Sequence, residues 1–369
     1  MVRSSTHRRD RCAIEPRRAP PQPLRCEPDS TGWGHGLNFS NLDPQQVLVS
    51  LDAVGLRGDG RILQLNSYEN RVFQVFLEDG SVVVAKFYRP GRWSDAQIVE
   101  EHAFALELAA AEVPVVPPLV LHRASDEPGL VLHGEPPTLA CRQTPEGQHR
   151  YTAAARCAGR EPELEDPAAL RQLGRFIGRL HAVGRQRPFV HRHHLNARAD
   201  GRLALQLLLD GGFVPDTQAA AWQQACESAL TAVEAAFEAA APLTTLRLHG
   251  DCHLGNVLWR DGAPHVVDLD DAMQGPAVQD LWMLVSGDRA TMAQQLGHLL
   301  EGYEQFSDFD DRERALIEPL RTLRMVRHSA WLAARWGDPT FPLNFPFFGS
   351  AAYWSQQTVQ LREQLEAMA

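Results

Sequence analysis

The spacing of apolar residues predicts that the folded part of the chain begins with β-strands. The segments RILQLN (61–66) and RVFQVFL (71–77) alternate apolar with polar positions, and the turn sequence EDG (78–80) leads into SVVVAKFY (81–88). β-branched and aromatic residues, which favour strands, fill all three segments. The pattern therefore predicts three antiparallel strands, with Lys86 near the end of the third.

A helical period follows in the segment SDAQIVEEHAFALELAAAEV (94–113). Ser94 and Asp95 are candidates for its N-terminal cap. On a helical wheel, Glu101 falls within an apolar arc formed by Ile98, Phe104, Ala105 and Leu108. Burying an unpaired carboxylate costs several kcal/mol or forces its protonation. We therefore expect a cation from the neighbouring strand to pair with Glu101.

Two more extended runs, near 118–122 and 150–155, complete the β-rich part, and beyond residue 165 the pattern becomes helical. The first of these helices is predicted at DPAALRQLGRFIGRLHAVGR (166–185), with Asp166 as its cap and Pro167 in its first turn. The order of elements predicts an α+β fold with two parts.

The two predicted parts differ in size as well as in secondary structure. A smaller, mainly antiparallel β part with one long helix covers 37–158, and a larger, mainly helical part covers 159–369. Residues 1–36 precede both, with seven arginines, a net charge of +3 and clustered prolines. That composition cannot build an apolar core, so we expect a disordered N-terminal extension.

Charge and hydropathy exclude two classes of partner for the body of the chain. Subtracting the +3 of the extension from the total charge of −10 leaves about −13 on residues 37–369, which repels a nucleic acid backbone. No run of about eighteen apolar residues is present, and the arginine-rich start lacks the apolar stretch of a secretory signal. We expect a cytoplasmic, monomeric protein that binds neither nucleic acid nor membrane.

The cysteines and the histidine cluster offer little chemistry. The six cysteines form no C-x-x-C pair, so we expect reduced thiols and no structural zinc. His191, His193 and His194 lack the helical spacing and the cysteine partners of a metal site, which favours a solvated loop. Cys252 and His253 are adjacent on a turn with no third orienting group, which argues against a nucleophilic pair.

The segment from 247 to 284 carries the strongest chemical pattern. It holds His249-Gly250-Asp251, then Asn256 five residues on, and Asp268 after a short apolar strand. Hard oxygen ligands of this kind suit magnesium, which keeps several waters and takes one or two carboxylates together with substrate phosphates. Phosphoryl transfer needs these parts, together with a base near the acceptor hydroxyl and a cation on the phosphates.

The chain offers one unusual candidate for that cation. Lys86 is the only lysine, while the other 35 of the 36 basic residues are arginine. A strand lysine, a helix glutamate (Glu101), H-G-D-x-x-x-x-N and then an aspartate follow one another in this chain. This order resembles that of the protein-kinase-like phosphotransferases that include aminoglycoside and choline kinases. The resemblance implies a two-lobed fold, with 37–158 as the nucleotide-binding lobe and 159–369 as the catalytic lobe.

The resemblance also implies roles for single residues. Asp251 would be the catalytic base that faces the acceptor hydroxyl, and Asn256 and Asp268 would bind Mg²⁺, with Asp268 catalytic as well. Lys86 would hold the α and β phosphates of ATP, with Glu101 as its ion-pair partner. A compact ammonium suits that place better than the broad planar fork of arginine. The loop that covers the nucleotide reads NSYENR instead of G-x-G-x-x-G, which makes Ser67 and Asn70 candidate phosphate contacts.

Residues beyond the catalytic motifs narrow the resemblance. The stretches KFYRPGRWSDAQIVEEH (86–102), GPAVQDLWML (275–284) and FPLNFPFF (341–348) are similar to bacterial serine/threonine protein kinases of the stress response, and the similarity spans about 38–360. It implies a protein substrate with a serine or threonine hydroxyl, and autophosphorylation. Two alternatives stay open, a small-molecule phosphotransferase and a non-catalytic nucleotide-binding module, although both key aspartates are present.

The short distance between Asp268 and Asp280 leaves no room for a long activation loop, so we expect a constitutively assembled site. Asp280 is interpreted as a structural anchor of the catalytic loop. Asp270 and Asp271 are interpreted as helix caps or solvated acids, with assistance to the metal as the alternative.

Overall fold

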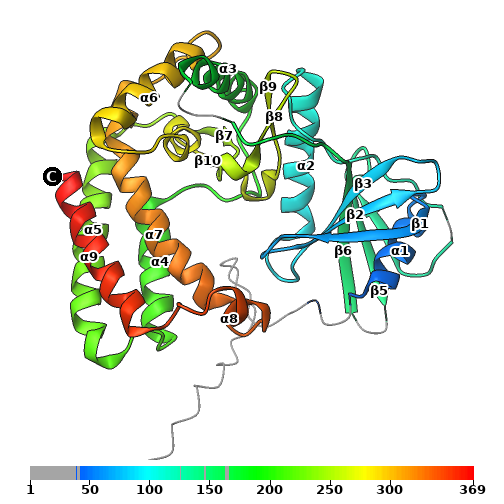
Figure 1. Ribbon diagram of the computed structural model, residues 1–369, viewed down its shortest axis with the longest axis horizontal. Coiled ribbons are helices and arrows are strands. Elements are labelled where there is room, and N and C mark those ends of the chain that lie inside the picture. The colour runs from blue at the N-terminus through cyan, green and yellow to red at the C-terminus, as the bar shows by residue number, and fades with distance from the viewer. Residues whose placement is uncertain (1–38, 40–41, 125, 145–146, 163–165) are drawn as a thin grey trace, which may run out of the picture.

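The computed structural model describes residues 39, 42–124, 126–144, 147–162 and 166–369. A β-sheet lies at one end of the molecule and a group of helices at the other, with α2 between them (Figure 1). The mixed α+β fold of the sequence prediction is confirmed. The predicted extension 1–36 lies outside the described residues, and the boundary between 158 and 159 stays a prediction.

A six-stranded antiparallel sheet forms the first part. In spatial order its strands are β1 (Gly58–Leu65), β2 (Arg71–Leu77), β3 (Val82–Phe87), β6 (Gly147–Ala155), β5 (Leu139–Thr144) and β4 (Leu130–His133). Lys86 on β3 lies between Val72 of β2 and Thr152 of β6, so strands on both sides hold its backbone. Helix α1 (Pro44–Ala53), capped by Asp43, packs Val47 and Leu51 into the core of this sheet.

The sequence prediction was wrong about part of this sheet. β4 and β5 were missed, and residues 118–122 form no strand, because only Pro118 makes an isolated bridge, to Ala154 of β6. Pro117 and Pro118 have no N–H group to donate to a ladder, so this segment reaches β6 only through the Pro118 bridge and the bond from Leu119 N–H to the Ala153 carbonyl (2.7 Å).

Helix α2 (Asp95–Ala110) begins at Ser94, whose side chain accepts a hydrogen bond from the Gln97 backbone, while the Gln97 side chain accepts one from the Ser94 backbone N–H. This capping box satisfies two orphan N–H groups. The apolar arc predicted for the helix is buried, and so is Glu101, at 5% exposure. The helix thus carries a carboxylate into the interior between the sheet and the helical part.

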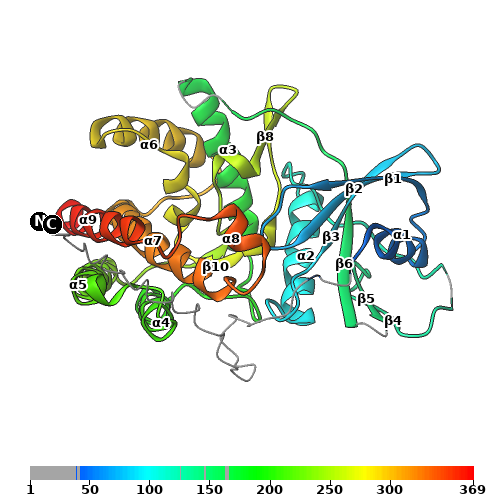
Figure 2. The same cartoon turned by 60° about the horizontal axis from the view of Figure 1, so that its bottom comes forward.

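The second part is mainly helical, as predicted. Its α-helices are α3 (Pro167–Gly184), α4 (Ala197–Asp210), α5 (Asp216–Ala240), α6 (Arg289–Tyr303), α7 (Ile317–Ala334), α8 (Thr340–Asn344) and α9 (Ala351–Met368). Figure 2 shows α4, α5, α7 and α9 gathered at the end away from the sheet. They share one apolar core that includes Trp222 and Trp354. No described helix is long and apolar enough to cross a membrane.

Short elements between α5 and α7 carry the segment in which the sequence places its strongest chemical pattern. The strands pair as β7 (Leu246–Leu248) with β10 (Met273–Gly275) and as β8 (Val257–Arg260) with β9 (Ala263–Val266). Single 3-10 turns connect or follow them: η1 (Leu254–Asn256), η2 (Leu269–Asp271), η3 (Ala277–Asp280), η4 (Trp282–Leu284) and η5 (Asp311–Leu316). These elements bring 249–271 to the edge that faces β3.

The two parts also touch through the loop between β1 and β2. The Tyr68 ring packs on Phe345, with ring centroids 4.9 Å apart. The Glu69 carboxylate accepts a hydrogen bond from the Trp331 indole N–H (2.7 Å) and forms an ion pair with Arg335 (2.7 Å). This contact closes the sheet over the helical part on one side of a deep cavity.

Candidate active site

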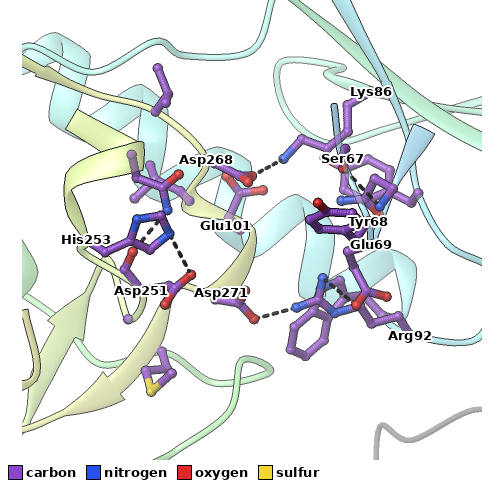
Figure 3. Close-up of a pocket in the computed structure, with 18 of the residues that line it drawn as sticks. Ser67, Tyr68, Glu69, Lys86, Arg92, Glu101, Asp251, His253, Asp268 and Asp271 are labelled. Carbon is purple, nitrogen blue, oxygen red and sulfur yellow. Dashed lines mark hydrogen bonds and ion pairs between the residues drawn. The ribbon is translucent and has the colours of Figure 1, made fainter. Parts of the chain in front are cut away.

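A cavity of about 1210 Å³ lies between the two parts and brings together every site residue predicted from the sequence. These residues are Ser67, Asn70, Lys86, Glu101, Asp251, Asn256 and Asp268. They come from the β1–β2 loop, β3, α2 and the 249–271 segment, and Figure 3 shows most of them around one space. The fold thus brings motifs that lie far apart in the sequence to one cavity.

The loop that holds Asp251 is shaped by glycine and fixed by Asp280. Gly250 has φ +86°, and a Cβ there would overlap the backbone carbonyl oxygen of Asp271, so only glycine fits. The buried Asp280 carboxylate accepts hydrogen bonds from the backbone N–H groups of His249 (2.7 Å) and Gly250 (2.8 Å). It also bonds His181 (3.1 Å). The interpretation of Asp280 as a structural anchor is confirmed.

Asp251 opens on the cavity with its side chain 24% exposed. Its carboxylate forms an ion pair with Arg324 of α7 and lies 3.5 Å from His253 Nε2. Burial disfavours the ionised form, but the hydrogen bonds and charges of His253 and Arg324 outweigh it and hold the pKa of Asp251 well below its ordinary value. The carboxylate is therefore ionised and able to accept a proton from a hydroxyl.

Asn256 and Asp268 present oxygen atoms that fit a magnesium ion. The Asn256 side-chain N–H donates to the Asp251 carbonyl (3.0 Å), which leaves the amide oxygen as a ligand atom. Asp268 adopts left-handed backbone angles (φ 62°, ψ 65°), a strained conformation for a residue with a side chain, and its carboxylate is 53% exposed. The nearby Asp270 Oδ1 is buried without a hydrogen-bond partner. A bound Mg²⁺ would neutralise charge on phosphate oxygens here.

Lys86 pairs with acids at the other wall of the cavity. Its Nζ lies 3.0 Å from Asp268 Oδ1 (Figure 3). It also lies 3.7 Å from Asp270 Oδ1. Although burial disfavours the ammonium, these carboxylates raise the pKa of Lys86 well above its ordinary value. Lys86 is therefore a charged ammonium at neutral pH.

The expected ion pair between Lys86 and Glu101 differs from what the structure shows. In the described part of the chain, Lys86 pairs with Asp268 and Asp270, and the Glu101 carboxylate lies 3.7 Å from His102 Nε2. Burial raises the pKa of Glu101 to about 7, with the charges of Lys86 and Arg192 opposing the rise. A carboxyl group whose pKa is raised by burial competes poorly for Lys86 with the closer carboxylates of Asp268 and Asp270.

The interpretation of Asp270 as a cap or solvated acid was wrong. Asp270 is 3% exposed, and its Oδ2 bonds Arg92 (2.6 Å) and the side-chain amide of Asn70 (3.1 Å). Burial opposes its ionisation, but Arg92, Lys86 and Arg192 hold the pKa of Asp270 well below its ordinary value. Arg92 also pairs with Asp271 (2.5 Å). In the sequence, only the presence of an arginine-rich segment, YRPGRW (88–93), and an acidic one, VDLDD (267–271), hinted at this cluster. Their contact is a product of the fold.

The same contacts change the expected role of Asn70. Its amide N–H donates to Asp270, and its oxygen accepts from the Arg89 backbone (3.1 Å), so both ends are occupied. Asn70 thus ties the β1–β2 loop to the catalytic segment, and its second amide N–H stays a candidate phosphate contact. The Ser67 hydroxyl oxygen accepts a hydrogen bond from the backbone N–H of Asn70 (3.3 Å). This bond does not use the hydroxyl proton, which can be donated to a phosphate. Ser67 stays a candidate phosphate contact.

Residues 61–317 match the model of the phosphotransferase enzyme family, which is most of the chain. The chain belongs to this family. Phosphotransferases of this kind take their phosphoryl group from ATP, so the cavity is the candidate site of ATP-dependent phosphoryl transfer.

Curated relatives of this phosphotransferase are similar over nearly their whole length. Stress response kinase A of Salmonella choleraesuis is 43% identical over 334 residues, which cover 90% of this chain and 96% of that protein. The serine/threonine protein kinase RdoA of Salmonella typhimurium gives the same identity and coverage. Stress response kinase A of Escherichia coli K12 is 42% identical over 331 residues, covering 89% and 94%.

Solved structures confirm the two-lobed kinase-like fold of the phosphotransferase. Amicoumacin kinase, solved with AMP-PNP, Ca²⁺ and its antibiotic, superimposes with a TM-score of 0.65 at 18% identity and covers 88% of this chain and 94% of its own. A microcompartment-associated aminopropanol kinase gives a TM-score of 0.64 at 16% identity, covering 88% and 98%. At such identities the likeness concerns the fold, not the acceptor.

Proposed function

We propose that the protein is a magnesium-dependent serine/threonine protein kinase of a bacterial stress response, which transfers the γ-phosphoryl group of ATP to a protein hydroxyl. The observation that carries the proposal is the ionised Asp251 carboxylate, which shares one cavity with Lys86 and with the oxygen ligands of Asn256 and Asp268. That arrangement contains the base, the cation and the metal ligands that phosphoryl transfer requires.

In this proposal each part of the cavity has one task. Asp251 accepts the proton of the acceptor hydroxyl, Asn256 and Asp268 hold Mg²⁺, and Lys86 holds phosphate oxygens of ATP. Ser67 donates its hydroxyl to a phosphate. Glu101 faces Lys86 from α2 and forms the pair predicted from the sequence when Asp268 binds the metal.

The protein acceptor rests on the similarity to a named protein kinase. The relative named serine/threonine protein kinase RdoA is 43% identical over 90% of this chain. The proposal includes a cytoplasmic location, because ATP is a cytoplasmic co-substrate. It also includes a monomer with lobes at 37–158 and 159–369.

Labelling with γ-³²P-ATP tests the proposal. We expect the purified protein to label itself and a generic protein substrate on serine or threonine, in a reaction that stops with EDTA and resumes with Mg²⁺. Phosphoamino acid analysis identifies the acceptor. Asp251→Ala should abolish the label, while the control Asp311→Ala, at a carboxylate 80% exposed outside the cavity, should keep it.

A panel of aminoglycosides, amino alcohols and sugars belongs in the same experiment. Label on one of these and on no protein would replace the proposal with a small-molecule phosphotransferase. Binding of ATP without any transfer would replace it with a nucleotide-binding module.

A further inference from the structure

Helix α7 lays one face along the cavity beside Asp251. The residues of this face lie three or four positions apart, as one side of a helix requires, and are Leu320, Leu323, Arg324, Arg327, His328 and Trp331. None of the six is acidic. The acceptor must approach Asp251 past this face, so the charges of the α7 side chains meet the incoming substrate first.

Arg324 occupies the place that the acceptor hydroxyl needs. Its guanidinium pairs with Asp251 Oδ1, and its side chain is 45% exposed, which leaves it free to move. A hydroxyl that donates its proton to Asp251 competes with this pair. The competition becomes favourable when the acceptor brings an anion of its own that Arg324 can bind instead.

Arg327 lies one helical turn further along the same wall of the cavity. Among the residues that the structure describes, Arg327 has neither a hydrogen-bond partner nor an ion-pair partner, and its side chain is half-buried. A guanidinium that faces a cavity without an acid beside it is a ready partner for a carboxylate or a phosphate.

The acids of the cavity do not offset these charges. Glu69 is paired with Arg335 (2.7 Å) and Arg89 (3.1 Å), and Asp271 is paired with Arg92 (2.5 Å). Asp268 lies on the nucleotide side with Lys86. Arg327 thus adds positive charge to the acceptor side without a paired acid among the described residues, which disfavours the cationic aminoglycosides that need acidic surroundings.

We propose that Arg324 and Arg327 select a serine or threonine flanked by acidic side chains. One carboxylate of the substrate takes Arg324 and so frees Asp251, and a second binds Arg327. In an extended peptide the serine and the residues two and four positions from it point to one side, with successive ones about 7 Å apart, close to the spacing of side chains one helical turn apart. The inference rests on the proposed protein kinase function and adds its substrate class.

Three peptides of equal length test the inference, each with a central serine and with glutamate, glutamine or lysine at the second and fourth positions on either side of it, which share its face. We expect wild-type kcat/KM for the glutamate peptide to exceed that for the glutamine peptide about tenfold, the size of one charge-assisted hydrogen bond, with the lysine peptide lower still. Arg327→Glu should reverse the order of the glutamate and lysine peptides, mainly through KM.

Two further variants keep the test sharp. Arg327→Gln, a milder change, should bring the kcat/KM values of the three peptides closer together without reversing their order. Arg362→Glu makes the same charge reversal on exposed α9, outside the cavity, and should keep the wild-type order. Partial unfolding lowers all three rates together, so a reversed order cannot come from it.

The outcomes separate the inference from the proposed function. Equal labelling of the three peptides, or an unchanged order in Arg327→Glu, would overturn the selection of acidic segments while the protein kinase assignment stands. Label on no peptide and on a small-molecule hydroxyl would overturn both.

Discussion

At the scale of single residues, the site combines charges that must differ in shape as well as in sign. All other Lys/Arg positions of the chain are arginine, yet the residue on the central strand β3 that faces the cavity is Lys86. Its Nζ lies 3.0 Å from Asp268 Oδ1. An ammonium is a compact point charge, whereas a guanidinium is a wide planar fork. The space among two aspartates and a phosphate therefore favours lysine.

We predict that Lys86→Arg lowers kcat/KM by on the order of 10² or more, comparable to the loss of one electrostatic stabiliser of a transition state. Steady-state transfer from labelled ATP measures the change. The conservative exchange Arg362→Lys on exposed α9 is the control. Activity within about threefold of wild type would show that the shape of the cation has no role here.

The two aspartates should fail in different ways. Asp251→Ala is expected to abolish transfer and to keep ATP binding, because Asp251 faces the acceptor. Asp268→Ala is expected to lose transfer together with the magnesium-dependent part of ATP binding. Calorimetry with ATP, with and without Mg²⁺, separates the two. Normal turnover in Asp251→Ala would remove Asp251 from the role of base.

At the scale of elements, short turns do more for the site than the long helices. The loop after β7 carries His249, Gly250 and Asp251, and Asp280 of η3 binds two of its N–H groups. Helices α3 and α6 surround this region and contribute apolar core. The precision of the base therefore depends on a few backbone angles.

Gly250→Ala tests that dependence. The positive φ and the overlap with the Asp271 carbonyl should cost about 2 kcal/mol or more of unfolding free energy and displace Asp251, which lowers kcat. Gly297→Ala in α6 is the matched control, because a Cβ there has open space and should stabilise the helix by about 0.5–1 kcal/mol. Urea unfolding and kcat are measured on both. A Gly250→Ala variant as stable and active as wild type would contradict this account of the loop.

At the scale of the whole molecule, charged contacts hold the sheet and the helical part together. Glu69 of the β1–β2 loop binds Arg335 and Trp331, and Arg89 bonds Asp338 at 3.0 Å. These residues lie far apart in the sequence and are largely buried. The contact keeps Lys86 and Asp251 on facing walls of one cavity.

The stability of the folded protein should depend on pH through Glu313. This residue is 2% exposed and accepts a hydrogen bond from the Val278 N–H (2.9 Å), and burial raises its pKa to about 7. The folded state therefore holds the proton more tightly than the unfolded chain. Its stabilising contribution is complete below about pH 4.5 and is lost as pH rises through about 7.

From pH 5 to pH 8, wild type should lose about 2–3 kcal/mol more unfolding free energy than Glu313→Gln, whose amide oxygen keeps the Val278 bond without titrating. Urea unfolding at both pH values gives the difference. Glu363→Gln, on an exposed position of α9, should respond to pH as wild type does. Parallel pH profiles for wild type and Glu313→Gln would contradict the raised pKa.

The sequence by itself determined several of the elements and most members of the site. Alternation and turn residues predicted β1, β2 and β3, a wheel predicted the buried face of α2, and motif spacing predicted Asp251, Asn256 and Asp268. These signals are local, since each depends on neighbours within a few residues. The missed strands β4 and β5 lie next to proline-rich segments that weaken the same signals.

Only the tertiary structure decided which charges meet. Arg324 binds Asp251 from 73 positions away, and Asp270 is buried against Arg92 from 178 positions away. Lys86 pairs with Asp268 instead of Glu101 because the fold brings the aspartate closer and leaves the glutamate in a place where burial raises its pKa. An ion pair depends on distance in space and on exclusion of water, and neither is recorded in the order of residues along a chain.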